Sequence, residues 1–360
     1  MANPKPFKPE QKQDDNPART EKKTSLLKLV FIAAVTLAIL AAIISFITFR
    51  TVKSNYTKSG PLSQETVITV ASGTGLSSLA AQLEKDGLIE SALMLKLNAR
   101  LSGIGRNLKV GEYTIPKAAS MSDIIEIVST GKSILYPVTV PEGLTTAQIL
   151  RLISAADHLT GEVTLSPSEG TLLPETYMTP RGMDRDALIK KMMSDQEGLI
   201  TRLWETRQDG LPIKTKSEAI ILASVVEKET GVGGERAEVA GVFTNRLRRG
   251  MRLQSDPTII YGINKGEILI GRNGKQRGLR RSEIDRKTDW NTYQIDGLPK
   301  TAICNPGADA LAAVMQPAQT KNLYFVADGT GGHAFASTLA GHNANVAKWR
   351  KIERARRRGQ

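Results

Sequence analysis

Residues 217–230 read SEAIILASVVEKET. Ser217 can cap the start of a helix, and the almost wholly apolar run at 220–226 predicts that this helix is buried on most sides. Two carboxylates follow near its end, Glu227 and Glu229. At roughly 100° per residue they point about 200° apart, so they cannot share one face of the helix. We therefore expect the two carboxylates to have different surroundings.

Glu229 is the candidate for acid catalysis. It lies one turn beyond Val225 and Val226 and extends the more apolar stripe, whereas Glu227 faces a smaller and more polar surface. Apolar neighbours disfavour a charged carboxylate and raise its pKa, and the partial negative charge of a helix C-terminus acts in the same direction. Such a carboxyl group can donate a proton near neutral pH. The alternative is that residues 227–229 form a solvated helix end.

Polar and aromatic side chains gather downstream of this helix, in the segments 252–261 and 291–307. Amides, hydroxyls and aromatic faces in loops are typical of a sugar-binding site, although ordinary turn-forming side chains would give the same composition. A Gly-rich turn at 328–332 would bring His333 toward the site, whereas a lone His is more often structural. The candidates for supporting or substrate-binding roles are Glu227, Gln254, Asp256, Tyr261, Asn291, Tyr293, Asn305 and His333.

An apolar segment near the N-terminus predicts a membrane anchor. Residues 29–49 contain no charge, and a helix of that length, about 32 Å, can cross a bilayer core of about 30 Å. The alternative, a cleaved signal peptide, would have a shorter apolar core of roughly 7–15 residues. Seven Lys or Arg residues precede the segment and three lie between it and Pro61. This bias predicts a single-pass protein of the cell inner (plasma) membrane, with a cytoplasmic N-terminus and the rest of the chain outside the cytoplasm.

Charge and cysteine content narrow the classes of partner and cofactor. The net charge is +13, from 49 Lys and Arg against 36 Asp and Glu, which favours anionic surfaces. The basic clusters lie near the two termini and at 263–280 with few aromatic residues between them, so we expect no nucleic-acid partner. Cys304 is the single cysteine, which excludes an internal disulfide. The one Cys and three His residues are too few for a zinc site of the usual kind. We therefore expect no metal and no cofactor.

The chain as a whole reads as an α+β protein with a single N-terminal transmembrane helix. The β-branched run at 66–70 predicts a strand, and the spacing of Leu76, Leu79 and Leu83 predicts a helix after it. Beyond Gln254 we expect loops, apart from a strand at 323–327 and a helix at 343–357, with 263–280 as an exposed basic excursion. The expected parts are a basic disordered cytoplasmic tail (1–28), the membrane helix (29–49), a linker (50–65), a small α/β module (66–131), a larger mixed α/β domain (132–350) and a basic C-terminal tail (351–360).

Several motifs resemble those of the endolytic murein transglycosylase family, also called MltG or YceG-like. The resemblance spans most of the chain after the apolar segment. It is carried by EG at 142–143, LPET at 173–176, ASVVEKET at 223–230, ER at 235–236, VAGVFTNRL at 239–247, MRLQSDPT at 251–258, NTY at 291–293, GLP at 297–299, NPGA at 305–308, LYFVADG at 323–329 and GHAF at 332–335. The module at 66–131 resembles the LysM-like subdomain of that family. The long basic segment 263–280 and the long N-terminal tail depart from the family pattern.

The resemblance implies a specific activity. The family's catalytic acid is the second Glu of the EKET stretch, which corresponds to Glu229. The family cleaves the β-1,4 bond between N-acetylmuramic acid and N-acetylglucosamine within glycan strands and leaves a 1,6-anhydro-muramic end. A role as terminator of glycan elongation, peptidoglycan strands as substrate and peptidoglycan synthases as partners follow from the same resemblance.

One dominant carboxyl group suits a lytic reaction. Hydrolysing glycosidases normally need two carboxylates, because one must activate water or act as the nucleophile. A lytic enzyme needs no external water, since one group can protonate the leaving oxygen and then take a proton from the sugar's own C6 hydroxyl. Two other readings stay open: a hydrolase that leaves reducing ends, and a non-catalytic peptidoglycan-binding scaffold.

Overall fold

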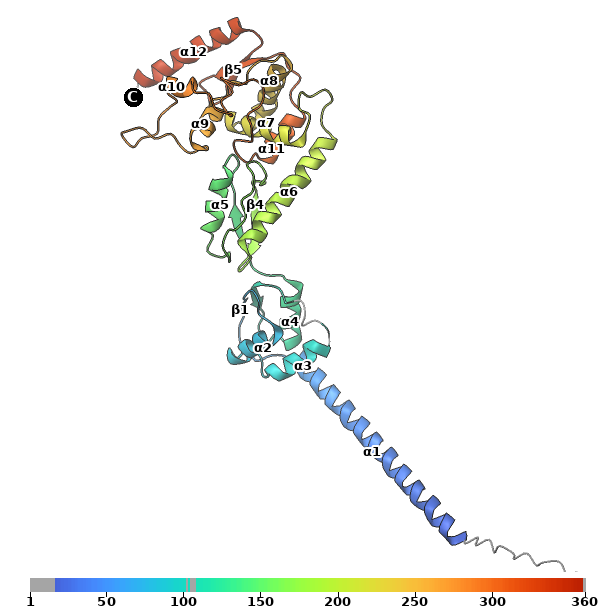
Figure 1. The fold of residues 1–360 in the computed structure, drawn as a ribbon. Coiled ribbons are helices and arrows are strands. Elements are labelled where there is room, and N and C mark those ends of the chain that lie inside the picture. The colour runs from blue at the N-terminus through green and yellow to red at the C-terminus, as the bar shows by residue number, and fades with distance from the viewer. Residues whose placement is uncertain (1–16, 102, 104–107, 359–360) are drawn as a thin grey trace, which may run out of the picture. The chain divides into compact units, whose positions relative to one another are not determined.

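The computed structural model describes residues 17–101, 103 and 108–358 (Figure 1). The chain divides into two compact units, which we describe separately. The first contains the long N-terminal helix and most of the small module. The second contains Thr69–Gly73, Val110–Tyr113 and all described residues from Ser133 onward. Both helices and short paired strands occur, as expected for a mixed α/β protein.

Helix α1 is longer than the predicted membrane segment and spans Pro17–Thr57. Its part from Lys28 to Thr57 contains an 18-residue window with a mean hydropathy of 2.9 and no buried residue, so it could cross a membrane by length and composition. Residues 17–28, expected to be disordered, are helical, and the helix also continues through 50–57 of the expected linker. Neither Pro nor Gly interrupts residues 18–59, so each further residue adds a hydrogen bond to an existing helix. Residues 1–16 of the expected tail lie outside the described residues.

The small module mixes strands and helices, and β1 and α2 lie where the sequence predicts a strand followed by a helix. Its elements are β1 (Thr66–Val70), α2 (Leu76–Lys85), α3 (Ala92–Leu101), β2 (Gly111–Ile115) and α4 (Met121–Thr130). β1 and β2 pair in a two-stranded sheet. Leu79 and Leu83 of α2 are buried, as their spacing predicts. Helix α4 begins at a capping box between Ser120 and Asp123, which satisfies two backbone N–H groups at its start.

The second unit begins with a two-stranded sheet covered by helices. Strand β3 (Leu135–Thr139) pairs antiparallel with β4 (Thr176–Pro180). Helices α5 (Thr146–Ser154) and α6 (Arg185–Glu205) pack their apolar faces on this sheet. The buried core between them includes Val138, Ile149, Ile153, Leu188 and Met192.

A cluster of helices around α7 forms the rest of the second unit (Figure 1). Its elements are α7 (Lys216–Glu229), the 3-10 turn η2 (Gly233–Glu235), α8 (Arg236–Arg248), α9 (Asp256–Asn264), α10 (Arg281–Ile284), α11 (Ala308–Met315), the hairpin β5 (Tyr324–Ala327) with β6 (His333–Ala336), and α12 (Leu339–Arg358). Helix α7 contacts α6, α8, α9 and α11. Its residues Leu222, Ala223, Val225 and Val226 are buried, as its apolar sequence predicts. This packing positions the end of α7, where the two carboxylates lie.

Three elements differ from the sequence-based expectation. Helices α9 and α11 occupy stretches expected to be loops, and α12 continues through Arg358, so residues 351–358 do not form a separate tail. Helix α9 is only nine residues long and starts with Pro257 in its first turn. A proline there suits a helix start, but short helices are marginal by themselves and depend on tertiary packing. Buried Ile259 and Tyr261 provide that packing.

Candidate active site

Glu229 is the last residue of α7, and its carboxyl group is partly buried. The pKa of Glu229 is raised from its ordinary 4.5 to about 7, first by burial and also by nearby Asp256, because both disfavour the charged form. A hydrogen bond from Ser255 and the positive charges of His333 and Arg246 act in the opposite direction. A carboxyl group with a pKa near 7 can donate a proton and take one back at neutral pH.

Ser255 donates a hydrogen bond from its hydroxyl to Oε1 of Glu229. Ser255 is itself buried, and its backbone N–H donates to Oγ1 of Thr292 at 3.0 Å. Thr258 closes the network, because its hydroxyl contacts Thr292 at 2.9 Å and donates to the Ser255 carbonyl at 2.6 Å. The start of α9 is therefore held at a defined position beside the end of α7.

Arg246 of α8 holds the segment that leads into Ser255. Its guanidinium is buried and donates to the carbonyls of Leu323 at 2.7 Å, Leu253 at 2.8 Å and Arg252 at 3.2 Å. It also contacts Oε1 of Gln254 at 3.4 Å. Gln254 has a φ of 52°, a left-handed conformation that a non-glycine residue adopts at a cost of about 1–3 kcal/mol. The contacts of Arg246 stabilise this strained backbone directly before Ser255.

Tyr293 and Asp256 form a second polar pair near Glu229. The Tyr293 hydroxyl donates to Oδ1 of Asp256 at 2.8 Å. Burial, followed by the negative charge of Asp256, raises the pKa of Tyr293 well above its usual range, so its proton stays available as a donor. Asp256 and Glu229 both contribute to that shift, which shows that the three groups share one electrostatic environment.

His333 stands at the start of β6 and is held by Glu235. Its backbone N–H donates to Oε1 of Glu235 at 2.9 Å, and its Nδ1 lies 2.7 Å from Oε2. A Cβ on Gly332 would lie 2.4 Å from Oε1 of Glu235, so a side chain there would disturb the pair. The β5–β6 hairpin thus brings His333 close enough for its charge to stabilise the Glu229 carboxylate.

Glu227 points to a different environment from Glu229. Its side chain is only 6% exposed and contacts Arg236 of α8 at 3.5 Å. Its Oε2 accepts the backbone N–H of Gly307 at 3.0 Å, at the start of α11. Arg236 also pairs with Glu142 at 3.1 Å. These contacts give Glu227 a place in the packing of α7, α8 and α11, on the side expected from its angle to Glu229.

Asn291 and Asn305 are completely buried, and both amides are engaged by the protein. The Asn291 amide donates to the carbonyls of Ile284 and Arg286 at 2.9 and 2.7 Å. Asn305 accepts the backbone N–H of Leu172 at 2.9 Å, and its amide donates to Leu144, Thr146 and Glu169 at 3.1–3.2 Å. Their predicted contact with a glycan stays a prediction, while the structure gives both residues a role in joining loops.

Tyr261 lies on the inner side of α9. Its hydroxyl donates to Oε2 of Glu169 at 3.1 Å, and its ring packs edge-on against Trp290 at 5.7 Å between centroids. The ammonium group of Lys265 lies 3.8 Å from the centroid of the Trp290 ring. Of the eight supporting candidates, Gln254, Asp256, Tyr293 and His333 therefore gather around Ser255 and Glu229, whereas Glu227, Tyr261, Asn291 and Asn305 connect elements elsewhere in the second unit.

Comparison with known proteins places the chain among its relatives. The sequence model of the YceG-like family matches residues 68–348. This chain belongs to the YceG-like family.

Two named relatives of this YceG-like chain are called endolytic murein transglycosylase. The protein of Streptococcus pneumoniae serotype 2 (strain D39) is 27% identical over 326 residues, which cover 78% of this chain and 57% of the pneumococcal protein. The protein of Bacillus subtilis (strain 168) is 27% identical over 316 residues, which cover 78% of this chain and 84% of the relative. A solved yceG-like protein from Listeria monocytogenes is 23% identical, covers 78% of this chain and 98% of its own, and has a TM-score of 0.47.

Three residues of the candidate site were not among those predicted from the sequence: Ser255, Arg246 and Glu235. All three occur in the motifs that resemble those of the family, but nothing local distinguishes them from capping or surface residues. Arg246 carried the clearest signal, because an Arg in the apolar run VAGVFTNRL must be paired if it is buried. Among the described residues, no group of three or more His, Cys, Asp or Glu could hold a metal ion.

Proposed function

We propose that this chain is a membrane-anchored endolytic peptidoglycan transglycosylase with Glu229 as its general acid and base. The observation that carries the proposal is the partly buried carboxyl group of Glu229, whose pKa is raised to about 7 and which accepts a hydrogen bond from Ser255. The names of the pneumococcal and Bacillus relatives support the same class of reaction. The substrate is the glycan strand, and the bond is the β-1,4 linkage between N-acetylmuramic acid and N-acetylglucosamine.

The reaction needs one carboxyl group in two protonation states. The Glu229 carboxyl group donates its proton to the glycosidic oxygen as the bond from that oxygen to C1 of muramic acid breaks. The resulting carboxylate then takes the proton of the C6 hydroxyl, and the C6 oxygen bonds to C1 to close the 1,6-anhydro ring. Glu229 ends protonated, and no water enters the products.

The groups around Glu229 suit the second half of this cycle. The Ser255 hydroxyl and the charges of Arg246 and His333 stabilise the carboxylate, while burial and Asp256 favour the protonated acid. These opposing effects keep the protonated and ionised forms of Glu229 close in free energy. A catalytic group whose pKa lies near the operating pH is efficient both at donating and at accepting a proton. We assign Gln254, Asp256 and Tyr293 to substrate contacts, because Asp256 begins α9 beside this group and the other two lie on adjoining loops.

The proposed setting is the outer face of the inner membrane. Helix α1 anchors the chain with its N-terminus in the cytoplasm, in line with the excess of basic residues before the apolar segment. The module at 66–131 acts as the LysM-like module, and the enzyme terminates glycan elongation beside peptidoglycan synthases. The partnership with a synthase is tested by co-elution of a synthase with the full chain in detergent. We expect co-elution with the full chain and its loss when residues 66–131 are removed.

Digestion of purified peptidoglycan by the full chain in detergent tests the activity. The parent is expected to release fragments with 1,6-anhydro ends, and Glu229→Gln to lose activity by about 10²–10⁴-fold, the usual contribution of general acid–base catalysis. Glu205→Gln, at the exposed end of α6, is the matched control and should keep full activity. Products heavier by one water would indicate a hydrolase. Equal cleavage by parent and Glu229→Gln would overturn the proposal, and binding without cleavage by the parent would favour a scaffold.

A further inference from the structure

Helix α3 carries an exposed apolar stripe. Leu93, Leu97 and Leu101 are 59%, 42% and 70% exposed and are spaced four residues apart, so they lie along one face of the helix. The opposite face is buried in the module through Ala92, Leu95, Asn98 and Ala99. A small soluble module gains nothing from presenting three leucines in a row to water, and such a face marks an interaction surface.

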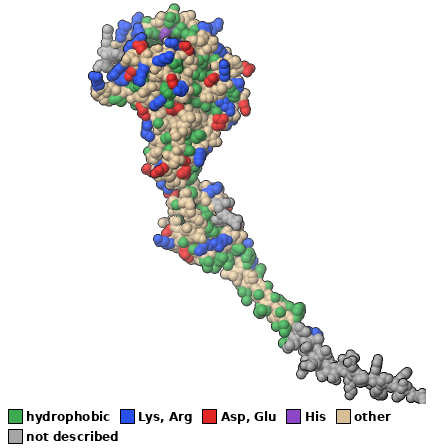
Figure 2. Space-filling model, in the orientation of Figure 1, with side chains coloured by type: hydrophobic (Ala, Val, Ile, Leu, Met, Phe, Trp, Pro, Cys, Tyr) green, Lys and Arg blue, Asp and Glu red, His purple; other side chains and the backbone are tan. Residues whose placement is uncertain are grey.

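The stripe is held close to the membrane end of α1. The side-chain amide of Asn98 in α3 donates to the backbone carbonyl of Val52 in α1 at 3.3 Å. Tyr56, one turn further along α1, is buried. Figure 2 shows hydrophobic side chains on the surface of both α1 and the adjoining part of the module. Helix α3 therefore packs on α1 through its buried face, next to the apolar surface of the anchor, and leaves its leucine stripe exposed.

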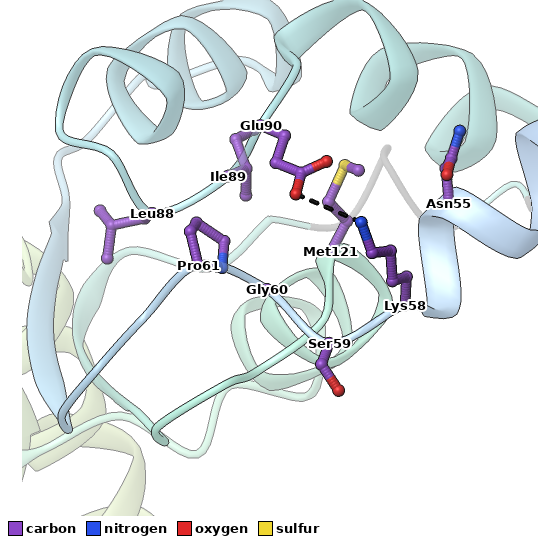
Figure 3. Close-up of a pocket in the computed structure, with 9 residues that line it drawn as sticks. All are labelled: Asn55, Lys58, Ser59, Gly60, Pro61, Leu88, Ile89, Glu90 and Met121. Carbon is purple, nitrogen blue, oxygen red and sulfur yellow. Dashed lines mark ion pairs between the residues drawn. The ribbon is translucent and has the colours of Figure 1, made fainter.

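The connection after α1 is also tightly packed (Figure 3). Lys58 pairs with Glu90 at 3.5 Å, across a small pocket that also includes Pro61 and Met121. The Gly60 N–H donates to the Ala118 carbonyl at 3.1 Å, and a Cβ on Gly60 would lie 2.2 Å from the carbonyl oxygen of Ala119. This pocket has a volume of only about 10 Å³, room for about one water molecule. The end of α1 and the module therefore belong to one packed unit.

The position of Val52 sets the depth of α3. It lies three residues beyond Phe49, the last residue of the apolar segment, which corresponds to about 4.5 Å along a helix. The headgroup layer on each side of the hydrocarbon core is about 5–7 Å thick. With Phe49 placed at the edge of the hydrocarbon core, the contact between α3 and α1 falls within that layer, at the depth where amphipathic helices bury their apolar faces.

The charges around the stripe match a phospholipid surface. Helix α3 contains Lys96 and Arg100 and no acidic residue, and α1 contributes Arg50 and Lys53 at the same level. Basic side chains beside an apolar face can reach lipid phosphates while their apolar stems stay in the interface.

We propose that α3 is an interfacial helix that inserts Leu93, Leu97 and Leu101 into the outer surface of the bilayer that α1 crosses. This inference rests on the proposed role of α1 as an anchor and adds a second contact with the same membrane. One contact along α1 leaves the exported part free to tilt, whereas a second contact through α3 fixes the module against the lipid surface.

Site-specific fluorescence on the full chain in nanodiscs of zwitterionic and anionic phospholipids tests the proposal. An environment-sensitive dye is attached to Leu93→Cys, Leu97→Cys or Leu101→Cys, with nitroxide quenchers placed on the headgroup or deep in the acyl chain. Cys304 is buried and stays in place, so the unsubstituted chain controls for background labelling. Ala38→Cys in α1 and Ser78→Cys on the exposed face of α2 are the two position controls.

The expected result is a blue-shifted spectrum at the three α3 positions with strong quenching by the headgroup nitroxide. The Ala38 position should respond to the deep nitroxide, and the Ser78 position should stay water-like. Leu93→Gln combined with Leu101→Gln should weaken quenching of a dye at position 97, whereas Val67→Gln, an exposed apolar residue of β1, should not.

Three outcomes separate the possible failures. Water-like spectra along α3, with the Ala38 position still quenched, would overturn the proposal and leave the anchor intact. An unquenched Ala38 position would instead overturn the anchor on which the proposal depends. A blue shift along α3 without lipid quenching would show that protein, such as a second copy of this chain, covers the leucines, and it would overturn a lipid contact.

Discussion

The hydroxyl of Ser255 donates a hydrogen bond to the carboxylate of Glu229, and this contact joins the start of α9 to the end of α7. The two residues lie 26 positions apart in the sequence. Between them, α8 supplies Arg246, which binds the backbone just before Ser255. The pKa of the carboxyl group that we propose as catalytic therefore depends on how α7, α8 and α9 pack, as well as on the sequence of α7 itself.

Ser255→Ala should raise the pKa of Glu229 above about 7, because the lost hydrogen bond favours the carboxylate. A hydrogen bond to a charged group contributes about 1.5–3 kcal/mol, and one pKa unit corresponds to about 1.4 kcal/mol. We expect the pH profile of cleavage to move upward by roughly one unit in the limb that reports Glu229. The measurement is kcat/KM against pH, with exposed Ser63→Ala as the control. A profile that stays in place would show that the contact does not tune Glu229.

The stability of the protein should decrease as the pH rises from about 4.5 to about 7. The pKa of Glu229 is raised in the folded chain, so between these values the folded state binds more protons than the unfolded state. The stabilisation by protonated Glu229 is complete at a pH below the pKa that this residue has in the unfolded chain. It is lost at a pH above the pKa that the residue has in the folded chain. Glu229→Gln removes this dependence on pH. At pH 8 the free energy of unfolding of this variant should exceed that of the parent by at most about 3 kcal/mol.

Urea unfolding of the full chain in detergent, followed by tryptophan fluorescence at pH 5 and pH 8, measures this difference. The gain for Glu229→Gln over the parent should be larger at pH 8 than at pH 5. An equal difference at both pH values would contradict the raised pKa.

Arg246→Ala should destabilise the second unit and lower activity together. The substitution leaves the buried carbonyls of Leu253 and Leu323 without their donor, and each unsatisfied buried group costs about 1–3 kcal/mol. It also releases the left-handed backbone at Gln254. The free energy of unfolding and kcat are the two measurements. Arg248→Ala is the control, because Arg248 is exposed on the same helix and should change stability by less than about 1 kcal/mol.

Glu235→Gln should lower kcat more than it changes KM. The carboxylate holds both the backbone N–H and Nδ1 of His333, and a Gln in its place offers only one oxygen. Loss of one contact of about 1.4 kcal/mol corresponds to about tenfold in rate. Glu238→Gln, on the neighbouring helix α8, serves as the control for a Glu that contacts Asn322 and not His333. A change in KM alone would place the His333–Glu235 pair in substrate binding rather than in support of Glu229.

Local patterns predicted much of the secondary structure. Helix α7 and strand β1 could be read from apolar periodicity and β-branched residues, because these are properties of neighbouring residues. Helices α9 and α11 could not, since nine- and eight-residue helices are stabilised by the core they join rather than by their own sequence.

The site divides in the same way. Glu229 was predicted from the apolar stripe of its own helix, and the angle between Glu227 and Glu229 predicted their different surroundings. The buried positions of Asn291 and Asn305 could not be predicted, because an Asn in a loop has the same local sequence whether its amide faces solvent or other loops.

The amino-acid sequence by itself determined the apolar N-terminal helix, the buried helix that ends in two carboxylates, and the opposite directions of those carboxylates. These features depend on residues within a few turns of one another. Only the tertiary structure decided that Ser255, Arg246 and the His333–Glu235 pair surround Glu229. The physical reason is that a pKa and a hydrogen-bond network depend on distances through space, and packing brings together groups that lie up to about a hundred residues apart.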